Sequence, residues 1–568
     1  MKISYKNIAN LFEEKPSLKD VSSKLFQLGH EHDIFGNILD IEFTPNRGDC
    51  LSLHGVSRDL SVFYKKKNNL EIYDKEINEL DLKFENTATK DCPKISFLKI
   101  QIMNPVEFYK DYLEDYFIEF DIKKNNFFAD ITNYLSYELG QPTHAYDFKK
   151  IEDKIVLKNI NEDKIFKTLL DKEIKLSGQN LVFSSGDDVI NLAGIMGGKK
   201  TACSNKTDTA LIECAYFMKE KIIGKSLEYD LHSESSYKFE RGVDPHCHDF
   251  VLRRFIKIVE DHAEIKELSY VTSSYEDINE SSIEYDFNSI NQILGTNIDE
   301  IKMAGILCDL GFIIDNSCIF HPSYRHDIHN MNDIAEEIAR VIGYNNIPRK
   351  EFKINSTSKE SDAYIKENQI RNFFIENGFN EVINIPFSSQ KENESIVIDN
   401  PLDSNKPSMR INLINSLISN LLYNEKRQKD SIKLFEISDV YTKQDSISHK
   451  KKLAIIISGR RGQNFKEFSK VLDFNYMSEI SNSLNIDISK IKKIDRTDLD
   501  TKIKNPIFGI EIDLKEVDIK TPFLEKELNN DFIKYKKISE FPSTYRDISF
   551  LIVNRSKLND LELLIKSL

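Results

Sequence analysis

The sequence has no tryptophan, few cysteines for its length and no long apolar run. Its seven cysteines are scattered, odd in number and without a CxxC pair, which argues against a disulfide framework and against a thiolate zinc site. The longest apolar runs, such as Leu453–Ile457, are far too short to span a bilayer. The N-terminal segment lacks the uninterrupted apolar core of a secretory signal. We therefore expect a cytoplasmic protein that contacts no membrane.

Several common functional motifs are also missing. The sequence contains no P-loop, no Rossmann fingerprint, no HExxH motif and no nucleophile elbow. Lys and Arg number 78 against 92 Asp and Glu, and the net charge of −14 disfavours attraction of nucleic acid to the whole surface. Any contact with RNA must be local. A length of 568 residues exceeds what a single hydrophobic core supports, so several domains are expected.

The hydrophobic spacing predicts an α+β multidomain protein. Near the N-terminus it predicts a helix, a strand and a second helix at residues 18–28, 38–43 and 51–63. Later, two helices are expected to flank a strand-like segment within residues 281–348. Farther on, helices near 370–377 and 413–428 accompany strand-like runs at 432–441, 453–458 and 508–514. These runs indicate an antiparallel sheet with helices packed against it.

One acidic cluster is a candidate metal site. Asp327 is predicted at a strand end, and Asp333, Glu336 and Glu337 open the helix that follows. Spacings of three and four residues place the side chains of these helix residues on one face, so the four carboxylates are expected to converge. Carboxylate oxygens suit Mg²⁺. The alternative is that acidic residues at a helix start simply favour the helix dipole, with Asp333 near the cap.

A second group of polar residues could form a hydrolytic pocket. Thr132 and Asn133 are predicted to precede a helical stretch, and His144 follows it. The glycine-rich segment LAGIMGG (192–198) and Glu213 come later in the chain. A hydroxyl, an amide, an imidazole, a carboxylate and glycine backbone could together position water on an ester. Nothing in the sequence shows that these segments meet, and a packed or surface histidine is the alternative for His144.

The ordered motifs resemble one known family. The resemblance is carried by FTPNRGDCLSLHGVSRDL, DITNYLSYELGQPTHAYDF, LAGIMGG, ESSYKFERGVDP, PSYRHDI with DIAEEIARVIGYNNIP, NPLDSNKPSMR with KLFEISDVY, and FPSTYRDISFLI. Together they are similar to the beta subunit of bacterial phenylalanyl-tRNA synthetase. The resemblance implies an α₂β₂ complex in which an alpha subunit activates phenylalanine with ATP and transfers it to tRNA(Phe). This chain would support that reaction and edit its errors.

The resemblance also assigns roles to residues. It implies that a Mg²⁺ site shared with the alpha subunit uses Asp327, Asp333, Glu336 and Glu337. It implies a pocket that hydrolyses tyrosine mischarged onto tRNA(Phe), formed by Thr132, Asn133, His144, Ala193, Gly197 and Glu213. A site that hydrogen-bonds the extra hydroxyl of tyrosine can reject phenylalanine strongly.

The resemblance further implies a division into domains. The expected parts are an N-terminal α/β region (1–65), an editing-like tRNA-binding domain (66–265), a winged-helix-like Mg²⁺-binding module (281–348), an inactive class II synthetase-like core (350–535) and the incomplete start of a ferredoxin-like anticodon-binding domain (536–568). The acidic start of the last helix in the winged-helix-like module would repel phosphates, which argues against DNA binding. Most bacterial members of the family insert an OB-fold at the position between Phe35 and Gly36, and this sequence lacks it. We therefore expect a shortened form of the beta subunit.

Two other functions remain open from the sequence. One is a purely architectural subunit whose pocket is inert. The other is a free-standing hydrolase that edits mischarged tRNA without an alpha subunit, a hypothesis suggested by the missing tRNA-binding domains and the retained pocket residues.

Overall fold

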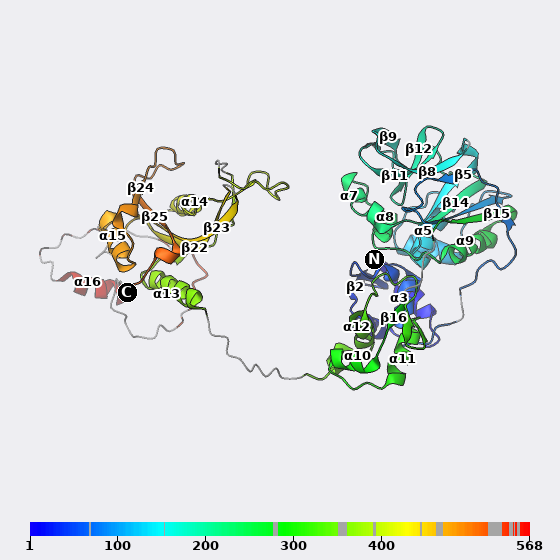
Figure 1. Ribbon diagram of the computed structural model, residues 1–568, viewed down its shortest axis with the longest axis horizontal. Coiled ribbons are helices and arrows are strands. Elements are labelled where there is room, and N and C mark those ends of the chain that lie inside the picture. Colours follow the sequence, from blue (N-terminus) through cyan, green and yellow to red (C-terminus); the bar gives the residue numbers. More distant parts are fainter. Residues whose placement is uncertain are drawn as a thin grey trace. The chain divides into compact units, whose positions relative to one another are not determined.

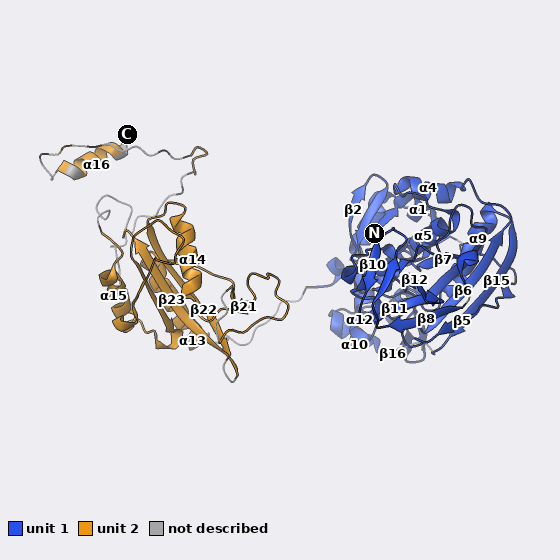
Figure 2. Ribbon diagram, turned by 90° about the horizontal axis from the view of Figure 1, so that it is seen from above, with its two compact units in different colours: residues 1–352 blue, residues 353–568 orange. Residues whose placement is uncertain are grey.

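The chain forms two compact units in the computed structural model, Met1–Phe352 and Lys353–Leu568 (Figure 2). The structure describes residues 1–67, 70–152, 154–276, 282–349, 361–389, 394–443, 446–461 and 470–520, together with parts of 535–567. Both units combine sheets with helices, and several of the sheets contain both parallel and antiparallel pairs, so the predicted α+β multidomain class is confirmed. The finer division into five parts stays a prediction.

The first unit begins with a small sheet in the order β1-β3-β2 and three helices. The elements are β1 (Lys2–Ser4), α1 (Tyr5–Asn10), α2 (Leu18–Gln27), β2 (Glu31–Phe35), β3 (Ile38–Glu42) and α3 (Leu53–Leu60). The predicted helix, strand and helix are therefore present. Ser17 and Ser52 cap α2 and α3, each accepting a hydrogen bond from a backbone N–H of the first turn. In the TPNRGDC turn between β3 and α3, the Arg47 guanidinium donates to both carboxylate oxygens of Asp49.

Two five-stranded sheets follow, in the orders β4-β15-β6-β14-β7 and β13-β12-β11-β8-β5. The first contains β4 (Asn78–Glu79), β6 (Lys94–Ile102), β7 (Thr143–Asp147), β14 (Thr209–Tyr216) and β15 (Ile265–Ser274). The second contains β5 (Phe84–Asn86), β8 (Ile155–Ile160), β11 (Asn180–Ser185), β12 (Asp188–Leu192) and β13 (Met196–Gly197). Between β8 and β11 the chain forms a separate hairpin of β9 (Lys164–Lys167) and β10 (Glu173–Leu176). Phe97 and Leu211 of the first sheet share a hydrophobic core with Leu157 and Val182 of the second.

Helices cover the other face of the first sheet, so this part has three layers (Figure 1). They include α4 (Asp111–Glu119), α5 (Phe127–Leu139) and α9 (His248–His262), and three short helices lie between β14 and α9: α6 (Lys219–Ile222), α7 (Lys225–Glu228) and α8 (Glu234–Phe239). Because alternate residues of a strand point to opposite faces, Ile212 of β14 packs toward the helices whereas Leu211 packs between the sheets. Glu213 therefore points between the two sheets.

Helix α5 begins earlier than the sequence indicated. Asn126 caps it by accepting from the backbone N–H of Ala129, so Thr132 and Asn133 lie inside the helix and not before it. The prediction was wrong because the helix begins at two phenylalanines, Phe127 and Phe128, that pack into the core. The helix ends at Gly140, whose φ of 85° is the left-handed conformation that favours glycine.

The last part of the first unit contains three helices and a small sheet in the order β16-β18-β17. Its elements are β16 (Ser282–Glu284), α10 (Phe287–Leu294), α11 (Glu300–Asp309), β17 (Ile313–Asp315), β18 (Cys318–Phe320) and α12 (Met331–Ile342). The strand-like segment predicted here forms the hairpin of β17 and β18, and three helices are present where two were expected. Strand β18 ends at Phe320, so Asp327 lies in a loop and not at a strand end, which corrects the prediction. Ile290 and Ile338 share a core with Leu25 and Val56 near the N-terminus.

The second unit has a sheet in the order β19-β22-β23-β25-β24, in which all pairs but β19 with β22 are antiparallel. Its elements are α13 (Asp362–Glu376), β19 (Asn380–Glu381), β20 (Phe387–Ser388), β21 (Ser408–Met409), α14 (Ile414–Glu425), β22 (Ser431–Lys443), β23 (Ile447–Gly459), α15 (Phe474–Ser483), β24 (Lys492–Ile494), β25 (Ile507–Asp513) and α16 (Leu558–Ser567). Helices α13 and α15 pack on one face and α14 on the other. The sheet and helices predicted here are confirmed, whereas the expected start of a ferredoxin-like domain (536–568) lies largely outside the described residues.

No helix in the described ranges is long and apolar enough to cross a membrane.

Candidate functional site

A cavity of about 480 Å³ gathers most of the predicted pocket residues. Its lining includes Thr132 and Asn133 from α5, His144 from β7, Gly197 from β13 and Glu213 from β14. The sixth predicted residue, Ala193, is 1% exposed and packs in the core between the sheets, while its neighbour Gly194 lines the cavity. The fold thus brings together segments that are up to about eighty residues apart in sequence, which spacing alone could not show.

Glu213 is the buried acid of this cavity. It is 4% exposed, and its Oε2 accepts hydrogen bonds from the Tyr146 hydroxyl at 2.6 Å and from Asn191 Nδ2 at 3.3 Å. Burial raises the pKa of Glu213 to about 7, against the lowering effect of these two hydrogen bonds. No described residue donates to its Oε1, and the side chain lines the cavity, so this oxygen can accept a ligand's hydroxyl group.

His144 lies directly across from Glu213 in the register of β7 and β14. Its ring packs edge-on against Tyr146 with the ring centroids 4.4 Å apart, and burial lowers its pKa to about 4. The imidazole is therefore neutral at pH 7. Its Nε2 is buried and has no hydrogen-bond partner within the part of the chain that the structure describes. A Cβ added to Gly197 would collide with this ring, so a larger residue there would displace the imidazole.

Further groups around the cavity include a hydroxyl, an amide and a thiol. Thr132 Oγ1 donates to the Ala129 carbonyl oxygen at 2.7 Å, which leaves its lone pairs able to accept. Asn133 is exposed at the rim. Burial raises the pKa of Cys203 to about 12, so at neutral pH this residue is a thiol and a poor nucleophile. The site is suited to binding a hydroxyl-bearing ligand and to orienting water.

The sequence patterns did not indicate Asn191, which lines the cavity, or Tyr146, which is fully buried and hydrogen-bonds Glu213. Asn191 Nδ2 also donates to the Tyr146 hydroxyl at 2.8 Å, so the two residues and Glu213 form a closed buried network. Tyr146 lies in the quoted motif around His144, two residues on, and therefore on the same strand face. That spacing was the available signal for Tyr146, and the sequence held none for Asn191.

The predicted acidic metal site does not form a cluster in this structure. Glu337 is buried and its two oxygens accept from Arg325 at 2.7 and 2.8 Å. Arg325 also donates to both oxygens of Asp327. Asn330 is the N-cap of α12, and Asp333 completes the capping box by accepting from the backbone N–H groups of His329 and Asn330, as the dipole alternative anticipated.

Glu336, the fourth predicted ligand, is exposed while its neighbour Glu337 is buried, because successive residues of a helix point about 100° apart. No three of the four carboxylates come together, contrary to the expected convergence. Although burial raises the pKa of Glu337, the hydrogen bond from Arg325 and the charge of Arg340 lower it to about 2. The acid is thus fully engaged by arginines, and these four residues as arranged do not fit a Mg²⁺ ion.

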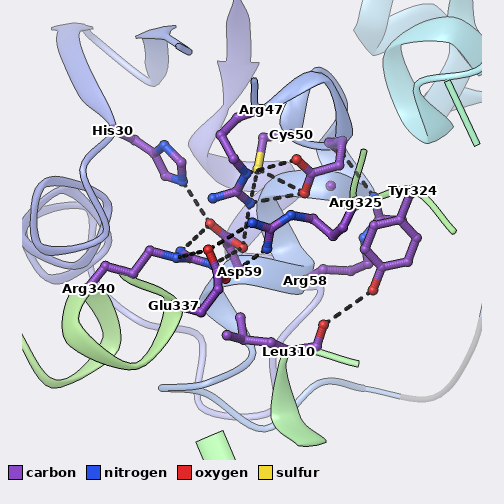
Figure 3. Close-up of polar contacts among 12 residues, drawn as sticks. His30, Arg47, Cys50, Arg58, Asp59, Leu310, Tyr324, Arg325, Glu337 and Arg340 are labelled. Carbon is purple, nitrogen blue, oxygen red and sulfur yellow. Dashed lines mark hydrogen bonds and ion pairs between the residues drawn. The ribbon is translucent and has the colours of Figure 1, made fainter. Parts of the chain in front are cut away.

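Glu337 belongs to a larger buried network of arginines and carboxylates (Figure 3). Arg340 donates to Glu337 and to both oxygens of Asp59, at 2.8 and 3.1 Å. Arg47 donates to Asp59 at 2.9 Å, and His30 Nε2 lies 2.8 Å from the same carboxylate. The network joins α12 to the N-terminal α3 within the first unit.

Within the described residues, one trio has the spacing of metal ligands: His30, Cys50 and Asp59, all buried. Arg47 Nη2 donates to both Cys50 Sγ and Asp59 Oδ1, each at 2.9 Å. Burial raises the pKa of Cys50 well above its usual value, so the ligating thiolate is absent at neutral pH. A metal ion beside the cations Arg47 and Arg340 would be repelled. The trio is part of the ion-pair network.

Three family models match successive parts of the chain. Residues 91–264 match the B3/4 domain, residues 283–344 match the tRNA synthetase B5 domain, and residues 347–506 match the phenylalanyl tRNA synthetase beta chain CLM domain. The cavity around Glu213 lies within the first match, and the acidic residues of α12 lie within the second.

Curated relatives agree with these matches. The chain is 28% identical over 581 aligned positions to the phenylalanine–tRNA ligase beta subunit of Francisella tularensis, covering 94% of this chain and 72% of that protein. The beta subunit of Photorhabdus laumondii is 26% identical, with 92% and 71% covered. The beta subunit of Thermotoga maritima is 32% identical over 439 positions, which cover 73% of this chain and 54% of that protein.

Proposed function

Because this chain belongs to the family of phenylalanine–tRNA ligase beta subunits, we propose that it hydrolyses tyrosine wrongly attached to tRNA(Phe). Attachment of phenylalanine, with ATP, takes place on an alpha subunit that assembles with this chain into an α₂β₂ complex. The observation that carries the proposal is Glu213, a buried acid with a pKa near 7 and one oxygen available to a ligand in the cavity.

Glu213 supplies the selectivity. The phenol hydroxyl of a tyrosyl group donates to Glu213 Oε1, while Tyr146 and Asn191 hold Oε2 in place. A phenylalanyl group has no hydroxyl and leaves that buried oxygen without a partner. Sites built to hydrogen-bond a substrate hydroxyl discriminate by about 10⁴ to 10⁵ against the analogue that lacks it. Correctly charged tRNA is thereby spared.

The hydrolysis itself is carried by water. The neutral imidazole of His144 can accept a hydrogen bond from water through Nε2, and Thr132 Oγ1 can accept another. Water oriented by these groups attacks the ester carbonyl carbon. The carbon–oxygen bond to the ribose breaks, and the ribose oxygen takes up a proton to leave free tyrosine and uncharged tRNA. The protonated state of Cys203 argues against a covalent thioester intermediate.

Mg²⁺ has no part in this proposal. The predicted ligands Asp327 and Glu337 are bound to Arg325, and no step of the hydrolysis needs a metal.

The proposal is tested with the chain co-expressed with its alpha subunit. The complex is given Tyr-tRNA(Phe) and Phe-tRNA(Phe), and release of each amino acid is followed over time. We expect rapid release of tyrosine alone, and a loss of about a hundredfold in the variant Glu213→Gln, the size of effect that loss of an aligned polar group has in other enzymes. Attachment of phenylalanine should be unchanged in this variant.

The matched control is Glu234→Gln, which removes an exposed carboxylate from the rim of the same cavity. Persistence of Tyr-tRNA(Phe) with the wild-type complex would refute the editing role and leave an architectural subunit. Release of tyrosine by this chain without the alpha subunit would favour a free-standing hydrolase.

A further inference from the structure

A second cavity, of about 350 Å³, lies in the first unit away from the Glu213 pocket. Its walls come from three separate stretches, residues 48–66, 139–141 and 242–251, together with Tyr324. None of its lining residues belongs to the Glu213 cavity. Nothing in the proposed hydrolysis uses it.

Two basic side chains enter this cavity from one face of α3. His54 and Arg58 are four residues apart, which places them one above the other on the helix. The Arg58 guanidinium lies over the ring of Tyr324, with its Cζ 3.9 Å from the ring centroid (Figure 3). Its Nη2 donates to the backbone oxygen of Asp49 at 3.0 Å. The stacking and this hydrogen bond hold the guanidinium plane in a fixed orientation.

Both side chains carry a buried nitrogen with no partner. Arg58 Nε and His54 Nε2 are hidden from solvent, and neither finds a hydrogen-bond partner among the residues described. Buried polar groups are normally hydrogen-bonded, and leaving a donor unpaired costs about 1–3 kcal/mol. The two nitrogens are therefore suited to a ligand that accepts hydrogen bonds.

A third base, Lys66, lines the same cavity and forms no ion pair with any described carboxylate. Burial, followed by the charges of Lys66 and Arg58, lowers the pKa of His54 to about 3. Desolvation and the charge of Arg58 lower the pKa of Lys66 as well. Lys66 and Arg58 thus make His54 harder to charge, and Arg58 does the same to Lys66, as expected for neighbouring positive charges.

Two carboxylates also line the cavity, and both are engaged elsewhere. Asp49 is held by Arg47 through two hydrogen bonds. Asp244 accepts from the Ser323 hydroxyl at 2.7 Å and from the backbone N–H of His246 at 2.9 Å. Because Arg47 neutralises Asp49, the cations Arg58 and Lys66 face the single carboxylate of Asp244, and the cavity keeps a net positive charge.

We propose that this cavity binds a phosphate group through Arg58, Lys66 and His54. A phosphate offers several acceptor oxygens and up to two negative charges, which match a fixed guanidinium, a flexible ammonium and an imidazole donor. The cavity is large enough to hold the group with part of the molecule that carries it. That molecule is either RNA, through its backbone, or a small phosphate compound.

The test measures binding of inorganic phosphate to the full chain by calorimetry. We expect saturable binding of phosphate. The affinity should fall about tenfold in Lys66→Gln, which is the contribution of one hydrogen bond to a charged group. Lys66→Arg keeps the charge and should keep the affinity. The matched control is Lys65→Gln, which removes the same charge from the neighbouring residue. The Lys65 side chain is paired with Glu13. Lys66 is exposed, so its replacement should leave the fold intact.

A second arm identifies the source of the phosphate. If the ligand is an RNA backbone, Lys66→Gln weakens binding of tRNA(Phe) and lowers the salt dependence of that binding by about one unit, while Lys65→Gln does not. If only inorganic phosphate binding falls, the ligand is a small phosphate compound. Failure of phosphate to bind, or an equal loss in Lys66→Gln and Lys65→Gln, would overturn the proposal.

Discussion

Replacing Glu213 with glutamine should make the chain more stable at high pH relative to the wild type. Glutamine has the same shape and can still accept from Tyr146, but it cannot ionise. The folded state raises the pKa of Glu213 from 4.5 to about 7, because charging the buried carboxylate is costly. A raised pKa means that the stabilising contribution of the protonated acid is complete below pH 4.5 and is lost as the pH rises through about 7.

The size of the effect follows from the pKa difference. Each pKa unit corresponds to about 1.4 kcal/mol, so the wild-type chain should lose about 3 kcal/mol relative to Glu213→Gln between pH 4 and pH 8. His144, whose pKa is lowered, is present in both proteins, and its contribution cancels in the difference. Any constant offset between the two proteins cancels in the same way.

The assay is urea unfolding of both proteins at several pH values, followed by circular dichroism. The difference in free energy of unfolding between variant and wild type should grow with pH and level off above pH 8. Glu234→Gln controls for the removal of one carboxylate from the same cavity. A difference between Glu213→Gln and wild type that does not change with pH would refute the argument that burial controls this acid.

Three further predictions concern the pocket and the ion-pair network. Gly197→Ala should abolish release of tyrosine from Tyr-tRNA(Phe) while phenylalanine attachment continues, because the new methyl group displaces the His144 ring; normal release would contradict this. Tyr146→Phe removes a donor to the Glu213 carboxylate, so the pH midpoint of tyrosine release should move upward, and a downward shift would contradict the assignment. Arg340→Met should lower the free energy of unfolding by about 3 kcal/mol in urea, because it leaves the buried carboxylates of Asp59 and Glu337 with fewer partners. A loss below about 1 kcal/mol would show that the remaining arginines stabilise these carboxylates without Arg340.

Local pattern determined much of the framework. The alternation of residues 211–215 is enough to place Glu213 on the same strand face as Leu211, and that face is buried between the sheets. The helices predicted near 18–28, 51–63 and 413–428 are present because their apolar spacing gives each a face to bury. Such features depend on neighbouring residues, so they can be read from the chain directly.

The family resemblance of the ordered motifs also predicted the pocket residues. Five of the six line one cavity, which the order alone could not establish. The editing roles of these residues stay predictions. Ala193 is the exception in position, because whether a small residue faces a cavity or the core depends on the packing around it.

Only the tertiary structure decided which charges meet. The sequence places four carboxylates close together near α12, but it cannot show that Arg325 binds Asp327 and Glu337, or that Arg340 reaches Asp59, 281 residues away. Ion pairs and pKa values depend on burial and on partners brought together by long-range packing. For the same physical reason, the buried network around Glu213 and the positive cavity around Arg58 became visible only in the folded chain.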